Sequence, residues 1–301
     1  FTFETGAASD TGRVRSHNED SFLALPEAGV WLVADGMGGH QAGDFASHAI
    51  AESVASLGRP VSAPDLQARF MDRLLRAHQT IQAQSQRLNG ATVGATLVAL
   101  LSYDRHFACI WSGDSRIYLL RGGQYTQVTM DHTEVNELLR TGAITPEQAE
   151  TWPRRNVITR AIGVHDRPMT DERSGGLADG DTFLLCSDGL TEHVEDHEMA
   201  AALAQYAPQD ACNALVQLTL SRGARDNVTV LVVRCRDRAA RHDPRAGRGL
   251  HALGIREMEA SDRRREDQTG IAARVHPIPD ADVGSISHSR RTSPGAAFGY
   301  L

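Results

Sequence analysis

The chain has 301 residues, of which 41% are hydrophobic and 23% are charged, and its formal net charge is −7. This length fits one large domain or two small ones, with enough apolar material for a sizeable core. It contains no run of about 18 uncharged apolar residues, so we predict no membrane span. Its first ten residues lack the basic and apolar regions of a secretory signal, and we expect a cytoplasmic protein.

The charges are unevenly distributed, and every Lys/Arg position is an arginine. Residues 1–237 contain 20 arginines and 30 acidic residues, whereas residues 238–301 contain 11 arginines and 8 acidic residues. The acidic part shows no basic stripe with interleaved aromatic residues, which argues against a nucleic-acid partner. The four cysteines are far apart in sequence, a pattern typical of buried thiols in a reducing compartment.

Runs rich in β-branched and aromatic residues predict short strands bounded by Gly, Asp or Ser. The predicted strands cover residues 1–9, 21–26, 30–35, 94–102, 106–113, 115–123, 124–130, 181–188 and 227–235. Residues 94–129 look like an antiparallel meander. Apolar residues at helical spacing predict helices at 42–57, 64–88, 133–141 and 208–221. Strands in runs and helices in pairs indicate an antiparallel α+β layer protein rather than a parallel doubly wound sheet.

The composition changes after residue 237. Residues 238–301 are rich in Arg, Gly and Pro and show little apolar periodicity. We therefore predict one domain over residues 1–237, followed by a basic, disordered tail over residues 238–301.

Four aspartates, Asp35, Asp114, Asp188 and Asp226, stand at the ends of predicted strands. An Asp-Gly pair after a strand is by itself more typical of a turn than of a site. Four such aspartates converging in one domain would repel one another unless a cation lay between them. A site made only of oxygen donors selects hard ions such as Mg²⁺ or Mn²⁺.

The surrounding residues suit such a site. Gly36 has no Cβ, so its carbonyl can approach an ion closely. Upstream, Glu19 and Asp20 can act through ion-bound water, and either Arg13 or Arg15 can grip an anion. Two ions sharing a water molecule beside an arginine suit hydrolysis of a phosphate ester.

The order of the motifs resembles that of bacterial metal-dependent serine/threonine protein phosphatases, the PPM or type 2C family. The resemblance covers roughly residues 3–235 and rests on these motifs: RSHNEDSF, VADGMGGHQAGDFAS, GATLVAL, WSGDSRIYLLR, TMDHT, NVITRAIG, LLCSDGLTEHV and ARDNVTVLVV. It implies a four-layer αββα sandwich, in which two antiparallel sheets are flanked by pairs of antiparallel helices, and two Mn²⁺ or Mg²⁺ ions at one edge.

The resemblance also implies a role for each matching residue. Asp35 would bridge both ions, the Gly36 carbonyl would bind the second, and Asp188 and Asp226 would complete the first site. Glu19 and Asp20 would hold ion-bound waters, and Arg15 would bind the substrate phosphate. Asp114 would bind a third, weaker ion together with Asp188, and residues 142–165 would form a mobile flap.

One position departs from the eukaryotic members, in which a histidine credited with protonating the leaving group follows the first Asp-Gly. Here Met37 stands at that place, and a thioether has no proton to give. His40 lies three residues further on, and we predict a surface or structural role for it. The proton donor is therefore unassigned.

The sequence leads to three functional hypotheses. The first is hydrolysis of phosphoserine and phosphothreonine in proteins, reversing a bacterial serine/threonine kinase and acting as a monomer. The second is a pseudophosphatase that binds phosphoproteins without turnover, and the third is a hydrolase of small phosphate monoesters.

Some polar and aromatic residues near the motifs have simpler interpretations. Trp31 and Trp111 are predicted to be core residues, and Arg116 a structural ion-pair partner. Ser187 is predicted to form a cap or another local hydrogen bond.

Overall fold

The structure is a computed structural model and describes residues 1–39 and 41–238. Among the described residues, no helix combines the length and the apolar character that a membrane span requires. The predicted disorder of the tail concerns residues outside the described part, as does the predicted role of His40.

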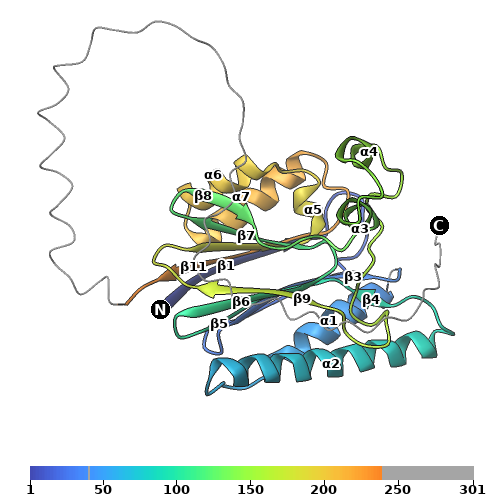
Figure 1. Ribbon diagram of the computed structural model, residues 1–301, viewed down its shortest axis with the longest axis horizontal. Coiled ribbons are helices and arrows are strands. Elements are labelled where there is room, and N and C mark those ends of the chain that lie inside the picture. Colours follow the sequence, from blue (N-terminus) through green and yellow to red (C-terminus); the bar gives the residue numbers. More distant parts are fainter. Residues whose placement is uncertain (40, 239–301) are drawn as a thin grey trace, which may run out of the picture. The chain divides into compact units, whose positions relative to one another are not determined.

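Two antiparallel sheets lie face to face in the middle of the fold (Figure 1). The first sheet has the order β1 (Thr2–Asp10), β11 (Val228–Arg236), β10 (Thr182–Cys186), β7 (Arg116–Arg121) and β8 (Gln124–Gln127). The second has the order β2 (Asp20–Leu25), β3 (Val30–Met37), β5 (Leu97–Tyr103), β6 (His106–Ser112) and β9 (Asp171–Gly176), with β4 (Gly94–Ala95) paired to the end of β3.

Helices cover the outer faces of both sheets. The long helices α1 (Gln41–Ala55) and α2 (Ala63–Arg87) lie on the second sheet, and α6 (Asp196–Gln205) and α7 (Pro208–Ser221) lie on the first (Figure 1). Pro64 and Pro208 occupy first-turn positions, and Ser62 caps α2 by accepting from the Asp65 N–H. The predicted four-layer αββα sandwich is confirmed.

Alternation along the strands explains the layers, because successive side chains point to opposite faces. In β3, Leu32 packs against α1 and α2, whereas Trp31 and Val33 pack between the sheets. In β11, Val230 and Val232 pack against α6 and α7. These strands are buried on both faces, which explains their nearly continuous apolar sequences.

Several details differ from the sequence prediction. Strands β5 and β6 pair as expected, but the chain then crosses at Asp114 to β7 in the other sheet, so the predicted meander over 94–129 is wrong. The strand predicted to end at Asp188 stops at Cys186, and Asp188 opens the short helix α5 (Asp188–Thr191). The prediction also lacks α4 (Pro146–Glu150), α5, α6 and β9.

Residues 134–157 form a separate loop that contains α3 (Glu134–Arg140) and α4. Its two ends are joined by an antiparallel bridge between Thr133 and Ile158. The N–H of Glu134 donates to the Val157 carbonyl at 2.9 Å. We call residues 134–157 the flap and the Thr133–Ile158 bridge its neck. The flap predicted over residues 142–165 overlaps this segment, and its bounds and mobility stay predictions.

Candidate functional site

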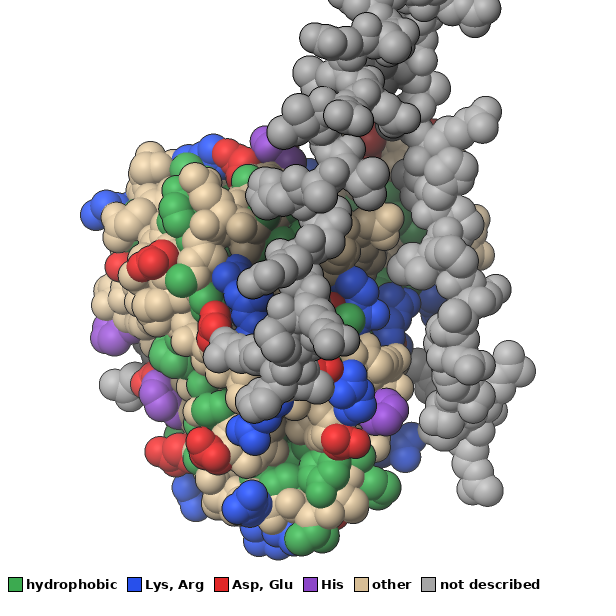
Figure 2. All heavy atoms as spheres, turned by 90° about the vertical axis from the view of Figure 1, so that its left-hand side faces the viewer, with side chains coloured by type: hydrophobic (Ala, Val, Ile, Leu, Met, Phe, Trp, Pro, Cys, Tyr) green, Lys and Arg blue, Asp and Glu red, His purple; other side chains and the backbone are tan. Residues whose placement is uncertain are grey.

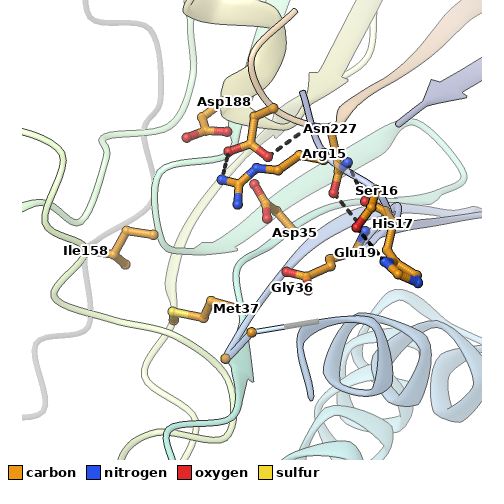
Figure 3. Close-up of a pocket in the computed structure, with 13 residues that line it drawn as sticks. Arg15, Ser16, His17, Glu19, Asp35, Gly36, Met37, Ile158, Asp188 and Asn227 are labelled. Atoms are coloured by element: carbon orange, nitrogen blue, oxygen red, sulfur yellow. Dashed lines mark hydrogen bonds and ion pairs between the residues drawn. The ribbon is translucent and has the colours of Figure 1, made fainter. Parts of the chain in front are cut away.

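A cavity of about 340 Å³ opens between the end of β3, the start of α5 and the loops that precede β2 and β11. Six of the predicted site residues line it: Arg15, Glu19, Asp35, Gly36, Asp188 and Asp226. Figure 3 shows the carboxylates of Asp35 and Asp188 and the guanidinium of Arg15 pointing toward one another. Aspartates from both sheets therefore meet at one cavity, as the sequence predicts.

The other two predicted acidic residues, Asp20 and Asp114, do not line the cavity and are buried beside it. Asp20 lies directly opposite Asp35 in the β2–β3 register, where like charges destabilise a sheet. Asp20 and Asp114 each have one buried carboxylate oxygen without a hydrogen-bond partner. Such orphaned oxygens fit a site that is completed by water or by a cation.

The cluster perturbs its own ionisation. Burial, together with the charges of its acidic neighbours, raises the pKa of Asp35 well above its usual range. Burial likewise raises the pKa of Asp20 and of Asp114 to about 7. For Asp188, burial and then the charges of nearby acidic side chains raise the pKa to about 6. These carboxyl groups thus share one small volume, in which burial and the neighbouring charges disfavour the ionised form of each.

These features fit a hard divalent cation, because the donors are all oxygens and the negative charge is in excess. In residues 1–39 and 41–238, no three acidic or histidine side chains already have the spacing of a metal coordination shell. The carboxylates of Asp35, Asp188 and Asp226 would therefore have to draw together around an ion.

Arg15 is the only one of the two candidate arginines that lines the cavity. Its Nη2 donates to Asp226 Oδ2 at 2.6 Å, and this ion pair raises the pKa of Arg15. Its side chain remains 54% exposed, so the guanidinium is open to an incoming anion. Arg13, in contrast, is exposed and does not line the cavity, and its backbone N–H donates to the Ala224 carbonyl at 2.8 Å.

Gly36 is a glycine because helix α1 approaches it closely. A Cβ at this position would lie 2.1 Å from the Gly43 carbonyl oxygen and 2.7 Å from the Glu19 carbonyl oxygen. Gly36 also donates its N–H to Glu19 at 3.1 Å. Close packing is therefore a sufficient reason for the missing side chain, and the role of the Gly36 carbonyl as a metal ligand remains a prediction.

Asn227 is a site residue that the sequence prediction did not single out. Its Oδ1 accepts from the Glu19 N–H at 2.8 Å, and its Nδ2 donates to the carbonyls of Thr11 and His17, both at 2.9 Å. One buried amide thus fixes the Arg15 loop against the start of β11. The only signal in the sequence was an asparagine directly after Asp226.

The local role predicted for Ser187 is wrong. Its hydroxyl donates to Asp20 Oδ2 at 2.8 Å and accepts from the Thr229 N–H at 3.0 Å, and it makes no capping bond to α5. Ser187 follows the first sheet and Asp20 belongs to the second. The hydroxyl therefore joins the two sheets beside the cavity.

Thr96 fixes the backbone of Asp35 from the other side. Its hydroxyl accepts from the Asp35 N–H at 3.1 Å, and its own N–H donates to the Asp35 carbonyl at 2.8 Å. The same hydroxyl lies 2.7 Å from that of Ser115, next to Asp114. Thr96 thus links the segments that carry two of the aspartates.

Several residues near the site have the structural roles that the sequence predicts. Trp31 and Trp111 are buried, and Nη2 of Arg116 pairs with Asp131 Oδ2 at 2.7 Å, so their predicted structural roles are confirmed. All four cysteines are buried and unbridged. Met37 lines the cavity; Figure 3 shows it on the same side as Ile158.

Comparison with known proteins agrees with this site. The family model described as "Protein phosphatase 2C" matches residues 11–219. The serine/threonine protein phosphatase PstP of Mycobacterium tuberculosis is 41% identical over 229 residues, which cover 75% of this chain and 44% of PstP. The chain thus matches less than half the length of that relative.

Two further matches extend over nearly the whole of the compared chain. The serine/threonine phosphatase stp of Listeria monocytogenes is 38% identical over 239 residues, covering 75% of this chain and 93% of stp. The crystal structure of the PstP catalytic domain in complex with two manganese ions has a TM-score of 0.69 and 37% identity, covering 78% of this chain and 99% of that one. Together with the family match over most of its described residues, these likenesses show that the chain belongs to the protein phosphatase 2C family.

Proposed function

We propose that the chain is a Mn²⁺- or Mg²⁺-dependent phosphatase that hydrolyses phosphoserine and phosphothreonine in proteins. The observation that carries this proposal is the meeting of Asp35, Asp188 and Asp226 with Arg15 at one open cavity. Family membership and the two manganese ions of the related PstP structure support it.

In this proposal, Asp35, Asp188, Asp226 and the Gly36 carbonyl hold two ions, and Glu19 and Asp20 act through water. Asp114 helps to hold a third. The bound ions supply a water of lowered pKa and neutralise charge on the phosphoryl oxygens. Asp20 is buried, its Oδ2 accepts from Ser187, and its Oδ1 has no hydrogen-bond partner, so Oδ1 is free to accept from a water.

Arg15 binds the phosphoryl group of the substrate. Its guanidinium now donates to Asp226, and substrate phosphate can take the place of that carboxylate as the acceptor. This exchange leaves Asp226 free to turn toward an ion. Met37 lines the cavity but has no proton to give, so water is the proton donor that this side of the cavity allows.

A phosphoprotein fits the cavity better than a small metabolite does. Sites for small ligands usually enclose most of the ligand surface. Here the phosphate-binding side chain is itself half exposed, at 54%. A phosphorylated residue on the surface of a protein can reach Arg15, whereas little here would enclose the remainder of a free sugar phosphate or nucleotide. The kinase partner, the monomeric state and the cytoplasmic location stay predictions.

The test compares phosphothreonine peptide hydrolysis by the wild-type chain and by Asp35→Asn and Asp226→Asn variants. We expect Mn²⁺-dependent turnover in the wild type, loss under EDTA, and a fall of at least about 1,000-fold in both variants. Wild-type turnover in either variant would show that the metal assignment is wrong. Mn²⁺ binding without turnover would indicate a pseudophosphatase, and a higher kcat/KM on nucleotides or sugar phosphates would indicate a small-molecule hydrolase.

A further inference from the structure

The turn that carries Asp114 crosses from one sheet to the other and is held on two sides. On one side, Thr96 packs against Gly113: a Cβ on Gly113, whose φ is +108°, would lie 2.7 Å from the Thr96 side chain. On the other side lies His132, whose N–H donates to the Gly113 carbonyl at 2.8 Å. The position of Asp114 therefore depends on how these two neighbours hold Gly113.

The imidazole of His132 makes a second contact with the same glycine, which fixes its tautomer. The Gly113 N–H donates to His132 Nδ1 at 3.2 Å, so Nδ1 carries no proton. In the neutral ring Nε2 then carries the proton and donates to Asp171 Oδ2 at 3.1 Å, and Arg160 Nη1 also lies 3.3 Å from Nε2. The ring is buried and stacks on Trp111 with 6.2 Å between centroids. Its orientation is thus fixed on three sides.

His132 also contacts the flap neck. Its carbonyl accepts from the Thr159 N–H at 2.8 Å, one residue after the bridged Ile158. Asp171, which accepts from the imidazole, also accepts from Arg160 Nη1 at 2.9 Å. These two hydrogen bonds lower the pKa of Asp171 to about 2, so its carboxylate stays charged. One residue therefore contacts the Asp114 turn through Gly113 and the neck through Thr159 and Asp171.

We propose that His132 is a positioning residue that couples the flap neck to Asp114. The inference rests on the proposed function, in which Asp114 helps to hold the weakest ion. A movement of the neck would reach Asp114 through two hydrogen-bonded residues, His132 and Gly113, that are packed against Thr96 and Trp111. Filling the site at Asp114 would in turn restrain the flap, because coupling between two sites is reciprocal.

Two substitutions test the hydrogen bonds of the two imidazole nitrogens one at a time. In His132→Asn, the amide oxygen can replace Nδ1 as the acceptor for Gly113, but nothing reaches Asp171. In His132→Gln, the amide can reach Asp171, but no acceptor remains for Gly113. Asp114→Asn removes the proposed ligand itself. The control is His197→Asn, because His197 is exposed on α6 and its side chain has 77% exposure.

The coupling can be measured with Mn²⁺ alone and the full chain. Trypsin can cleave the flap after Arg140, Arg154 and Arg155, all of which are exposed. We expect Mn²⁺ at concentrations that fill the weakest site to slow cleavage about three- to tenfold, the effect of about one hydrogen bond. Both His132 variants and Asp114→Asn should lose this protection, and His197→Asn should keep it.

Two further measurements identify the contacts. Long-range ¹H–¹⁵N spectra of the metal-free protein should show His132 as the neutral Nε2–H tautomer. Hydrogen exchange at the Gly113 amide should rise about tenfold in His132→Gln and stay near the wild-type rate in His132→Asn. An Nδ1–H tautomer, or Mn²⁺ protection that survives in both His132 variants, overturns the proposal. Failure of the proposed function would appear differently, as a wild-type chain without turnover whose Mn²⁺-dependent protection is intact.

Discussion

Asn227→Asp is a small change that tests how the site is built. It alters no side-chain shape, yet it replaces the Nδ2 donor with an oxygen. That oxygen would face the carbonyls of Thr11 and His17, each now 2.9 Å from Nδ2. The other oxygen could still accept from the Glu19 N–H. The substitution therefore breaks two of three hydrogen bonds and puts an acceptor against two acceptors.

The magnitude follows from these contacts. Each lost hydrogen bond is worth about 1 kcal/mol net, and a buried acceptor left facing other acceptors adds about 1–3 kcal/mol. Asn227 is only 5% exposed, so water cannot replace the lost partners without moving the loop. We expect the free energy of unfolding to fall by about 3–5 kcal/mol. Because the loop carries Arg15, kcat/KM for a phosphopeptide should fall by about 100-fold.

The pH dependence has a definite sign. Burial and the two carbonyls disfavour the charged form, so the pKa of the new carboxyl is raised in the folded state. A raised folded-state pKa means that stability is retained below the unfolded pKa of about 4 and lost as pH rises through the folded value. The difference between Asn227→Asp and wild type in the free energy of unfolding should therefore be smaller at pH 5 than at pH 8.

Urea unfolding at both pH values, together with phosphopeptide kinetics, measures these effects. The matched control is Asn213→Asp on the exposed surface of α7, where the Asn213 oxygen only accepts from Gln209 and a carboxylate can do the same. If Asn227→Asp matched wild type in unfolding and in kcat/KM at pH 8, the buried amide would not be what holds the Arg15 loop.

Three other predictions concern the same site. Gly36→Ala would place a Cβ 2.1 Å from the Gly43 carbonyl oxygen, so we expect a loss of about 3 kcal/mol in urea unfolding, and wild-type stability would contradict the close packing. Arg15→Ala should lower kcat/KM for a phosphopeptide about 10- to 100-fold, mainly through KM, whereas an unchanged KM would place phosphate elsewhere. Without divalent ions, the pKa values of Asp20 and Asp114 are both raised to about 7, so the folded protein favours their protonated forms. The free energy of unfolding should therefore fall as pH rises from 5 to 8 and these protons are lost. Melting temperatures should fall over that range in EDTA, and Mn²⁺ should raise them more at pH 8 than at pH 6; a rise in EDTA would contradict the buried cluster.

Local patterns predict an antiparallel α+β layer protein and single out the acidic residues of the site, whereas the four-layer sandwich and the role of each residue follow from the family resemblance. Asp35 lies near the end of β3 and Asp226 lies two residues before β11, and both strands are nearly continuous apolar runs, so each aspartate marks the place where the apolar core ends. Strand β9 gave no such signal, because its sequence, DERSGG, is mostly exposed at the edge of a sheet. Helix α6 buries Met199, Ala202 and Leu203, but it is short, and the polar residues around these three obscure their helical spacing in the sequence.

Other features depend on contacts that no local pattern contains. The crossing between sheets at Asp114 depends on Gly113 adopting a positive φ against Thr96. Asn227 and Ser187 act on partners more than 160 positions away in the chain, as their hydrogen bonds show. A sequence window around either residue shows only a polar side chain beside an aspartate.

The two sheets are held together by different chemistry in different places. Aromatic rings join them in the interior, where Phe107 packs edge-on against Phe183 with 5.0 Å between centroids. Beside the cavity, polar contacts such as the hydrogen bond from Ser187 to Asp20 join the sheets instead, and acidic side chains are concentrated there. On another face of the molecule, shown in Figure 2, acidic and basic side chains are interspersed instead. An ion shared by Asp35 and Asp226 would act beside the cavity as a removable cross-link between the two sheets of the sandwich. Chelation of the ion should therefore loosen the sandwich first at its catalytic edge, while the aromatic contacts in the interior keep the two sheets packed together.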